Sequence, residues 1–201
     1  MSHAAPNIIV IMTDQQRADL CARRGYALDT TPFMDALAQR GADFPVAYTS
    51  APVCGPARVS LFTGRYPSAH GARTNANIGD ARYSADLIDV LRNRGYRIGL
   101  SGKNHSHIGQ NRWDWCMGFG HDGSGEKEPS SKEKAFDGWL HGLRHMASHE
   151  PTPFPLECQY PYRIVSHAQQ WVAETSEEPF FLWMSFPEPH NPFQVPEPYY
   201  S

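Results

Sequence analysis

Three short apolar runs, each followed by polar residues, constrain the fold of this chain more than any other feature. They occupy residues 7–14 (NIIVIMTD), 96–100 (YRIGL) and 179–186 (PFFLWMSF). Apolar runs without strict alternation are typical of strands that are covered on both faces, so we predict three buried strands. Open α/β sheets bind their ligands at the carboxyl ends of the strands. The polar residues after these runs are therefore the first candidates for a functional site.

Helical patterns separate the predicted strands. The first helix begins at Pro32, after Thr31 as a potential cap, and stops at Gly41. A second helix spans about 85–93 and stops at Gly95. The remaining predictions, in chain order, are a long loop or insertion at 118–134, a helix at 135–147, an irregular Pro-rich segment at 151–162 and a helix at 163–176.

Length and composition allow one substantial core. The chain has 201 residues, of which 40% are hydrophobic, and this favours one domain or a large piece of one over 1–201. Alternation of apolar runs with helical patterns is typical of the α/β class. We therefore predict a mixed, largely parallel sheet flanked by helices.

The charge of the chain argues against nucleic-acid and membrane partners. Its formal net charge is -3, so no global positive field attracts polyanions or anionic lipid. No apolar segment approaches the length that spans a bilayer. The N-terminal residues lack the pattern of a secretory signal. We therefore expect a cytoplasmic protein, or a periplasmic or secreted one if a leader has been removed.

The segment SAPVCGPARVSLFTGR, residues 50–65, places a cysteine where a helix is predicted to begin. The chain has four cysteines and no C-x-x-C pair, so neither a disulfide framework nor a zinc ribbon is indicated. Pro56 suits the first helical turn and Gly64 the helix stop. Cys54 then lies near free N–H groups that attract anions, and Arg58 shares its helix face. From spacing alone, Cys54 is either a buried small hydrophobe or a low-pKa thiolate nucleophile.

The residues around Cys54 also support a third interpretation. CGPAR followed by VSLFTG resembles C-x-P-[SA]-R-x-x-x-x-T-G, the signature of the type I sulfatases in the alkaline-phosphatase superfamily. Further segments resemble the family in the same order: NIIVIMTDQQRAD, TTPFMDALAQRGADFPVAYTSAPVC, SGKNH and PFFLWMSFPEPHNPF. The resemblance implies that a formylglycine-generating or anaerobic maturation enzyme oxidises Cys54 to formylglycine. One hydroxyl of the aldehyde hydrate then attacks sulfur, and the other later expels the sulfate.

The resemblance also implies a divalent metal, usually Ca²⁺, with Mg²⁺ or Mn²⁺ as alternatives. Asp14, Gln15 and the modified side chain at Cys54 are its implied ligands. Gln15 stands where many sulfatases have a second aspartate, and the Asp-Gln pair with CGPAR also occurs in phosphonate monoester hydrolases of the superfamily. Phosphonate or phosphate esters therefore stay an alternative substrate class, as does a binding module in which Cys54 remains a thiol. Without the resemblance, Asp14 is a strand-end acid that caps a turn.

Four further side chains are implied to work with Cys54 in hydrolysing a sulfate monoester, such as a carbohydrate or aryl sulfate. Arg58 and Lys103 neutralise the sulfate oxygens, and His105 orients or deprotonates the aldehyde hydrate. His190 hydrogen-bonds the bridging ester oxygen and helps to protonate the departing alcohol. By residue type alone, these would be an exposed lysine and surface histidines.

The resemblance places this chain in the N-terminal portion of the family. The family's later Asp-Asn or Asp-His metal ligands have no counterpart, because neither dipeptide occurs in the sequence. We therefore expect a C-terminal portion of the same enzyme as a partner, and weak metal retention with little or no turnover by this piece alone. We further expect Asn75 to reach the pocket mouth, and Trp113, Trp115 and Trp139 to serve packing.

Overall fold

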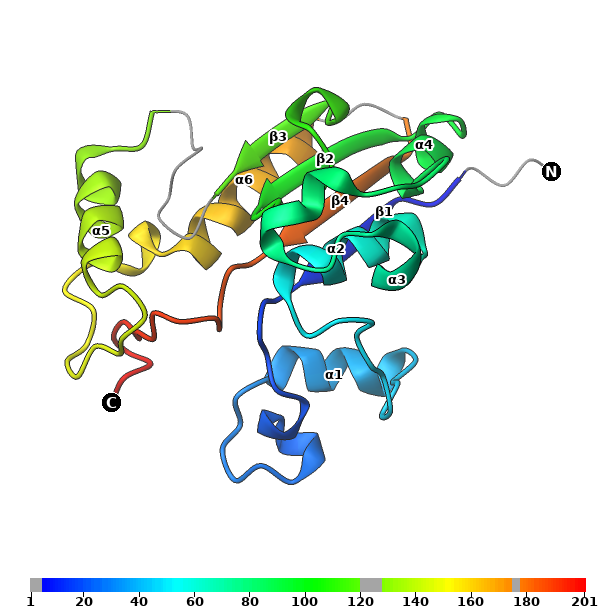
Figure 1. Ribbon diagram of the computed structural model, residues 1–201. Helices are drawn as coiled ribbons and strands as arrows, with labels where there is room; N and C mark the ends of the chain where they lie inside the picture. Colours follow the sequence, from blue (N-terminus) through cyan, green and yellow to red (C-terminus); the bar gives the residue numbers. More distant parts are fainter. Residues whose placement is uncertain (1–4, 120–127, 175–177) are drawn as a thin grey trace.

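The computed structural model describes residues 5–119, 128–174 and 178–201. Within these ranges, four parallel strands form one sheet in the order β1-β4-β2-β3 (Figure 1). The strands are β1 (Ile8–Met12), β2 (Arg97–Gly102), β3 (Trp115–Gly118) and β4 (Phe180–Ser185). The predicted α/β class, with a parallel sheet flanked by helices, is confirmed.

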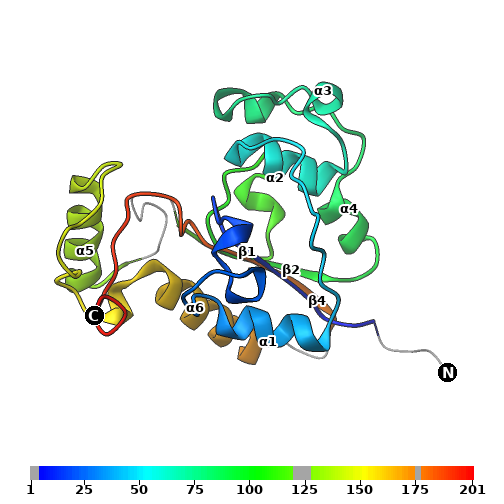
Figure 2. The same ribbon diagram turned by 90° about the horizontal axis from the view of Figure 1, so that it is seen from below.

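One face of the sheet packs against α2 (Cys54–Thr63) and α4 (Leu87–Arg92), and Figure 2 shows both helices on the same side of the strands. Successive side chains of a strand point to opposite faces, and β4 directs Phe181 and Trp183 into this core. Phe62 of α2 lies edge-on to Trp183, with ring centroids 4.8 Å apart. Other buried members of the core are Ile88, Leu91, Ile98, Leu100, Ile108 and Trp113.

The opposite face is covered by α6 (Tyr160–Glu174), and α5 (Ser131–Gly142) packs beyond it at the end of the molecule (Figure 1). Trp171 of α6 stacks on Trp115 with ring centroids 5.4 Å apart. Its ring also covers Gly99, where a Cβ atom would lie 2.8 Å from the indole. A glycine in β2 therefore makes room for the largest side chain of the covering helix.

Strand β1 lies at the edge of the described sheet and is covered on one face. Ile8, Val10 and Met12 pack against the core on the α2 side, but Ile9 and Ile11 are 51% and 66% exposed. The prediction that this strand is covered on both faces is therefore wrong. An apolar run does not reveal whether its strand is central or at an edge, and only the central strands here lie between two layers of helices.

The segment after β1 packs little against the sheet. Figure 1 shows α1 (Pro32–Arg40) set apart from the other helices, and none of the α1 residues is buried. Its start differs from the predicted cap. The Thr31 hydroxyl donates to the Asp35 carboxylate at 3.3 Å and makes no capping bond to a backbone N–H. Gly41 ends the helix, as predicted.

Some element boundaries differ from the predictions. Ser130 caps α5, so the last residues of the loop predicted at 118–134 are helical, while 120–127 lie outside the described residues. Helix α6 begins at Tyr160 instead of residue 163, and its predicted last residues, 175–176, also lie outside them. Strand β3 was not predicted, because a strand of four residues is too short to show a periodic pattern of apolar residues. The short elements are α3 (Pro67–His70) and the 3₁₀ turns Ala18–Leu20, Ala22–Arg24, Asn75–Asp80, Gln110–Arg112 and Leu156–Cys158.

The predicted packing role of the three tryptophans is confirmed, since Trp113 and Trp115 lie in or against buried clusters and Trp139 packs near Phe154. Among the described residues, none of the helices combines the length and apolar character that crossing a bilayer requires.

Candidate active site

The carboxyl ends of β1, β4 and β2 form the floor of the site. Register pairs Met12 with Ser185 and Ser185 with Gly102, so the three strands end in one row. Gly102 has a φ of 109°, and a Cβ atom there would clash with the Ser185 carbonyl oxygen. The next residue, Lys103, donates its N–H to that same carbonyl at 2.8 Å. This close approach requires glycine and places Lys103 beside the residues that follow the other strands.

Cys54 is the first residue of α2 and faces the end of β1. Its sulfur lies 3.4 Å from Oδ1 of Asp14, in a thiol to carboxylate hydrogen bond. The N–H of the next residue, Gly55, donates to Oδ1 of Asn75 at 2.9 Å, so one of the free amides at the helix start is satisfied. A Cβ atom at Gly55 would clash with Ile78. Asn75 thus supports the start of α2, a role different from the one predicted for it.

Two cations and one carboxylate, which we call the Asp14 cluster, lie together beneath Cys54. Nζ of Lys103 lies 2.6 Å from Oδ2 of Asp14, and Nη2 of Arg58 lies 3.5 Å from the same oxygen. Both cations are buried, each with 2% exposure. As the spacing predicts, Cys54 and Arg58 share a helix face, and here both meet Asp14.

Arg58 also ties the ends of two strands together. Its Nη1 donates to the Lys103 carbonyl at 2.8 Å and to Oγ of Ser185 at 2.6 Å. Its guanidinium lies over the Trp183 ring, 5.2 Å from the centroid. Much of its donor capacity is therefore used inside the protein, and its Nη2 contacts the carboxylate of Asp14.

The pKa directions define the protonation states at the site. Burial works to raise the pKa of Asp14, but the hydrogen bond and charge of Lys103, with Cys54 and Arg58, outweigh it and lower the pKa. Burial raises the pKa of the Cys54 thiol, and Asp14 adds to this effect. Cys54 is therefore a protonated thiol at neutral pH, which argues against the low-pKa thiolate interpretation.

The two histidines of the predicted set lie near the cluster. Burial lowers the pKa of His105, and the charges of Lys103 and Arg58 lower it further, so its imidazole is neutral at neutral pH. His190 lines the same cavity as Asp14 and Cys54, and its charge is among the weaker influences that lower the pKa of His105. Nδ1 of His190 lies 2.7 Å from the Asn191 carbonyl, and because a carbonyl oxygen only accepts, Nδ1 is the donor of this hydrogen bond.

A cavity of about 950 Å³ opens above these residues. Asp14, Gln15, Cys54, Arg58 and His190 line it. Arg65 and the exposed rings of Tyr48 and Tyr66 also contribute to its walls. The structure thus brings the seven predicted site residues to one edge of the sheet, five of them on the cavity wall and Lys103 and His105 next to it.

The chemistry of the implied metal can be compared with the donors present. Asp14 and Gln15 offer the oxygen atoms that a hard cation such as Ca²⁺ takes, and both line the cavity. In the described part of the chain, however, His, Cys, Asp and Glu form no group of three or more that could hold a metal ion. The donor type fits a hard cation, and these two side chains supply only part of the roughly six to eight oxygens of a calcium shell.

Sequence reasoning missed Ser185 and a second polar cluster. Ser185 ends β4, so the rule that polar residues follow strand ends could have found it. Asp86, His107 and Arg112 meet behind the loop that carries Lys103 and His105. The only signal for that cluster was Asp86 before an apolar helical pattern, which marks a helix cap.

Comparison with known proteins agrees with this geometry. The family model described as Sulfatase matches residues 6–201. An uncharacterised sulfatase of Escherichia coli K12, YidJ, is 29% identical over 96% of this chain and 40% of its own length. An arylsulfatase of Clostridium perfringens is 28% identical over 98% of this chain and 46% of its own length.

A solved structure has the same fold. The phosphonate monoester hydrolase of Agrobacterium radiobacter matches with a TM-score of 0.71 and 25% identity, over 97% of this chain and 43% of its own. The chain therefore spans less than half the length of these three proteins. Because the family model covers nearly all of the residues, the chain belongs to the sulfatase family of the alkaline-phosphatase superfamily.

Proposed function

We propose that the protein hydrolyses sulfate monoesters by means of a formylglycine made from Cys54. The position of Cys54 carries the proposal: it is the first residue of α2, on the wall of a large cavity and in contact with the Asp14 cluster. Two cations against one carboxylate leave that cluster with a positive charge, which suits an anionic ester. Membership of the sulfatase family supports the same chemistry.

The raised pKa of Cys54 fits a residue that is modified before it acts. In the proposed maturation, a two-electron oxidation converts the Cβ–Sγ unit to a thioaldehyde, and water then replaces the sulfur, which leaves as hydrogen sulfide, to give the aldehyde. Dioxygen is the oxidant for a formylglycine-generating enzyme, and a radical cofactor serves an anaerobic one. Water then adds to the aldehyde, which gives a carbon with two hydroxyl groups.

The proposed hydrolysis uses both hydroxyl groups in turn. His105, neutral because burial and neighbouring cations lower its pKa, takes a proton from the first hydroxyl as its oxygen attacks sulfur. The bond between sulfur and the alcohol oxygen breaks, and His190 gives the alcohol its proton. The second hydroxyl then gives its proton to water, which restores the aldehyde and expels sulfate. His105 releases its proton to solvent and His190 regains one, so both return to their starting states. Lys103 and Arg58 balance the charge of the sulfate oxygens during both steps.

Asp14 and Gln15 would hold the divalent cation that the family implies. When bound, it would polarise the oxygens of the hydrated aldehyde and of the sulfate group.

Mass spectrometry across Cys54 tests the proposal. Trypsin releases residues 41–58 as one peptide whose single cysteine is Cys54. In protein co-produced with a maturation enzyme, we expect this peptide to have lost sulfur and to react with an aminooxy probe. Produced together with the C-terminal portion that the family resemblance implies, the matured protein should release 4-nitrophenol from 4-nitrophenyl sulfate. Cys54→Ala should neither gain the aldehyde nor release 4-nitrophenol. An unmodified thiol in protein made with a competent maturation enzyme would contradict the proposal.

Phosphonate monoesters are the second candidate substrate class. The likeness to the phosphonate monoester hydrolase and the Asp14-Gln15 pair favour it. Both ester types carry one negative charge at neutral pH, so the charge of the Asp14 cluster suits either. Rates of the matured protein on 4-nitrophenyl sulfate and on 4-nitrophenyl phenylphosphonate separate the two, and we expect the sulfate ester to be the faster.

A further inference from the structure

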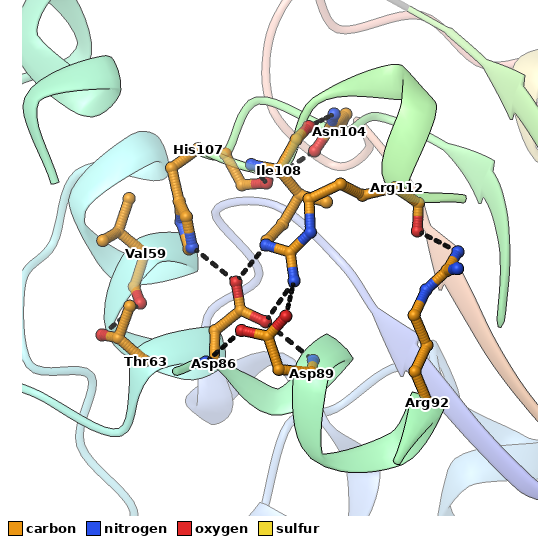
Figure 3. Close-up of polar contacts among 10 residues, drawn as sticks. Val59, Thr63, Asp86, Asp89, Arg92, Asn104, His107, Ile108 and Arg112 are labelled. Atoms are coloured by element: carbon orange, nitrogen blue, oxygen red, sulfur yellow. Dashed lines mark hydrogen bonds and ion pairs between the residues drawn. The ribbon is translucent and has the colours of Figure 1, made fainter. Parts of the chain in front are cut away.

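A second buried cluster lies behind the loop that carries Lys103 and His105, and we call Asp86, His107 and Arg112 the Asp86 cluster. The carboxylate of Asp86 takes four hydrogen bonds (Figure 3). Its Oδ1 accepts from the Asp89 N–H at 3.1 Å and from Nη2 of Arg112 at 3.0 Å. Its Oδ2 accepts from Nη1 of Arg112 at 2.5 Å and from Nε2 of His107 at 3.2 Å. Each oxygen has two donors, so the carboxylate is saturated.

These contacts fix the ring of His107 in one orientation. An ionised carboxylate only accepts, so Nε2 of His107 carries the proton that it donates to Asp86. The side chains of His107 and Asp86 are 3% and 0% exposed. The His107 ring packs edge-on against Tyr83 at 4.6 Å and against Phe62 at 6.4 Å between ring centroids. Ring packing and the hydrogen bond together leave His107 one position.

The loop from Lys103 to His107 is held at both ends. At its start, Arg58 donates to the carbonyl oxygens of Lys103 at 2.8 Å and Asn104 at 3.3 Å. At its end, His107 is held by Asp86. His105 lies between these anchors with a φ of 39°, a left-handed conformation that costs a non-glycine residue energy. The surrounding contacts must impose that conformation.

The loop is also closed by its own side chains. Nδ2 of Asn104 donates to the Ile108 carbonyl at 2.7 Å, and Oγ of Ser106 donates to Oδ1 of Asn104 at 2.6 Å. These bonds join the start of the loop to its end and enclose the residue at its apex, His105.

We propose that the Asp86 cluster is a positioning device that sets the place of His105, and with it the rate of proton transfer at the sulfate ester. The proposal rests on the proposed function for its reaction, but the placement of His105 can be measured without turnover. Its members are positioning residues, because they act on the reaction through the loop.

The expected effect on rate is large for residues that touch no substrate. A displacement of about 1 Å in a reacting group can lower a rate about 100-fold. We expect His107→Leu in the matured protein to lower kcat on 4-nitrophenyl sulfate about 10- to 100-fold, with KM changed less than about 3-fold. His107→Gln places an amide N–H near the position of Nε2. It should restore kcat to within about 3-fold of wild type.

A matched control separates positioning from general loss of stability. Nη1 of Arg163 pairs with Asp137 at 2.7 Å between α6 and α5, on the face of the sheet opposite to α2 and α4, and Arg163 is buried. Asp137→Asn should lower stability as a broken buried pair does and leave kcat unchanged. If His107→Leu fails to fold, Asp86→Asn, which keeps the shape of the side chain, is measured in its place and should lower kcat in the same way.

A spectroscopic measurement tests the placement by itself. In the unmatured chain, the ring resonances of His105 are identified by their loss in His105→Gln. They should shift in His107→Leu, return in His107→Gln and stay unchanged in Asp137→Asn. If the wild type proves inactive on sulfate esters while these shifts occur, the proposed function fails and the positioning role stands. Unchanged His105 resonances and unchanged kcat in folded His107→Leu would overturn the positioning role.

Discussion

The Asp14 and Asp86 clusters are built from similar groups and differ in how completely their carboxylates are bound. Asp86 takes four hydrogen bonds at 2.5 to 3.2 Å and lies in the interior. Asp14 has one short contact, to Lys103 at 2.6 Å, and two long ones, to Arg58 at 3.5 Å and Cys54 at 3.4 Å. It also lines the cavity. The carboxylate with long contacts can exchange them for a ligand, whereas the saturated one can only hold neighbouring residues in place.

The charge balance of the two clusters points the same way. Lys103 and Arg58 outnumber the single carboxylate of Asp14, so that cluster attracts an anion. Arg112 faces both Asp86 and Asp89, and burial keeps His107 neutral by lowering its pKa. The Asp86 cluster therefore offers no positive charge to a substrate. The predictions below test this division of roles.

The largest expected effect is the loss of turnover when Cys54, which contacts the Asp14 cluster, is replaced. On the proposed function, Cys54→Ala removes the nucleophile and should lower kcat on 4-nitrophenyl sulfate by more than about 10³-fold. The free energy of unfolding should change by less than about 1 kcal/mol. Cys116→Ala is the matched control, because burial raises the pKa of Cys116 to about 11 and makes its thiol inert. Substantial turnover by Cys54→Ala would place the nucleophile elsewhere.

The next largest effect is on the free energy of unfolding, when the central aspartate of each cluster is replaced by asparagine. Asp86→Asn should lower the free energy of unfolding by about 2–3 kcal/mol, below the roughly 3–5 kcal/mol of a fully buried pair, because Arg112 is partly exposed and keeps Asp89. Asp14→Asn should cost about 2–3 kcal/mol without added anion, because it leaves Lys103 and Arg58 buried without a carboxylate, and sulfate bound in the cavity should reduce that cost to about 1 kcal/mol or less. Urea denaturation with and without sulfate measures both. A cost for Asp14→Asn that sulfate leaves unchanged would contradict the assignment of roles.

A smaller effect concerns the dependence of stability on pH. Burial lowers the folded-state pKa of His107, so its contribution to stability is present above the unfolded pKa, about 6.5, and is lost as pH falls through the folded value. The groups that act on its ring are Asp86, Arg112 and His70, with the rings of Tyr83 and Phe62.

His107→Gln should therefore reduce the loss of unfolding free energy between about pH 7 and pH 5. It should not abolish the loss, because burial also lowers the pKa values of His70, His105 and His167. Chemical denaturation at a series of pH values measures the slope. An identical slope in wild type and His107→Gln would show that the ring is not held neutral by burial.

The smallest effect is expected at the exposed rim of the Asp86 cluster. Arg92 pairs with Asp114 at 2.9 Å, with the side chains 40% and 34% exposed. Arg92→Ala should change the free energy of unfolding by less than about 1 kcal/mol, because exposed ion pairs contribute little. A cost comparable to that of Asp86→Asn, measured by the same urea titration, would show that the cluster extends to this pair.

The floor of the site could be predicted from the sequence because its residues are marked by patterns within short segments of the chain. Asp14, Lys103 and His190 follow directly after apolar runs, and parallel strands bring their carboxyl ends to one edge. Cys54 and Arg58 were placed on one face by helical spacing. The same patterns predicted the α/β class. They did not predict the exposed face of β1, because the residues of a single strand do not show whether that strand is central or at the edge of the sheet.

The remaining contacts depend on residues far apart in the chain. Arg58 and Ser185 are 127 positions apart, and no periodicity connects them. Asn75 supports the amide of Gly55 from a separate turn, and Asp86 meets His107 only because the chain returns through β2. Such pairings follow from tertiary packing, and no pattern in a single sequence predicts them.

The geometry at Gly102 has a practical consequence for engineering. Its positive φ and the nearness of the Ser185 carbonyl mean that any side chain at this position would push β2 away from β4. A mutant library intended to change selectivity should therefore vary the cavity wall and keep glycine at 102. If position 102 is randomised, we expect every variant other than glycine to misfold, so these variants would carry no information about selectivity.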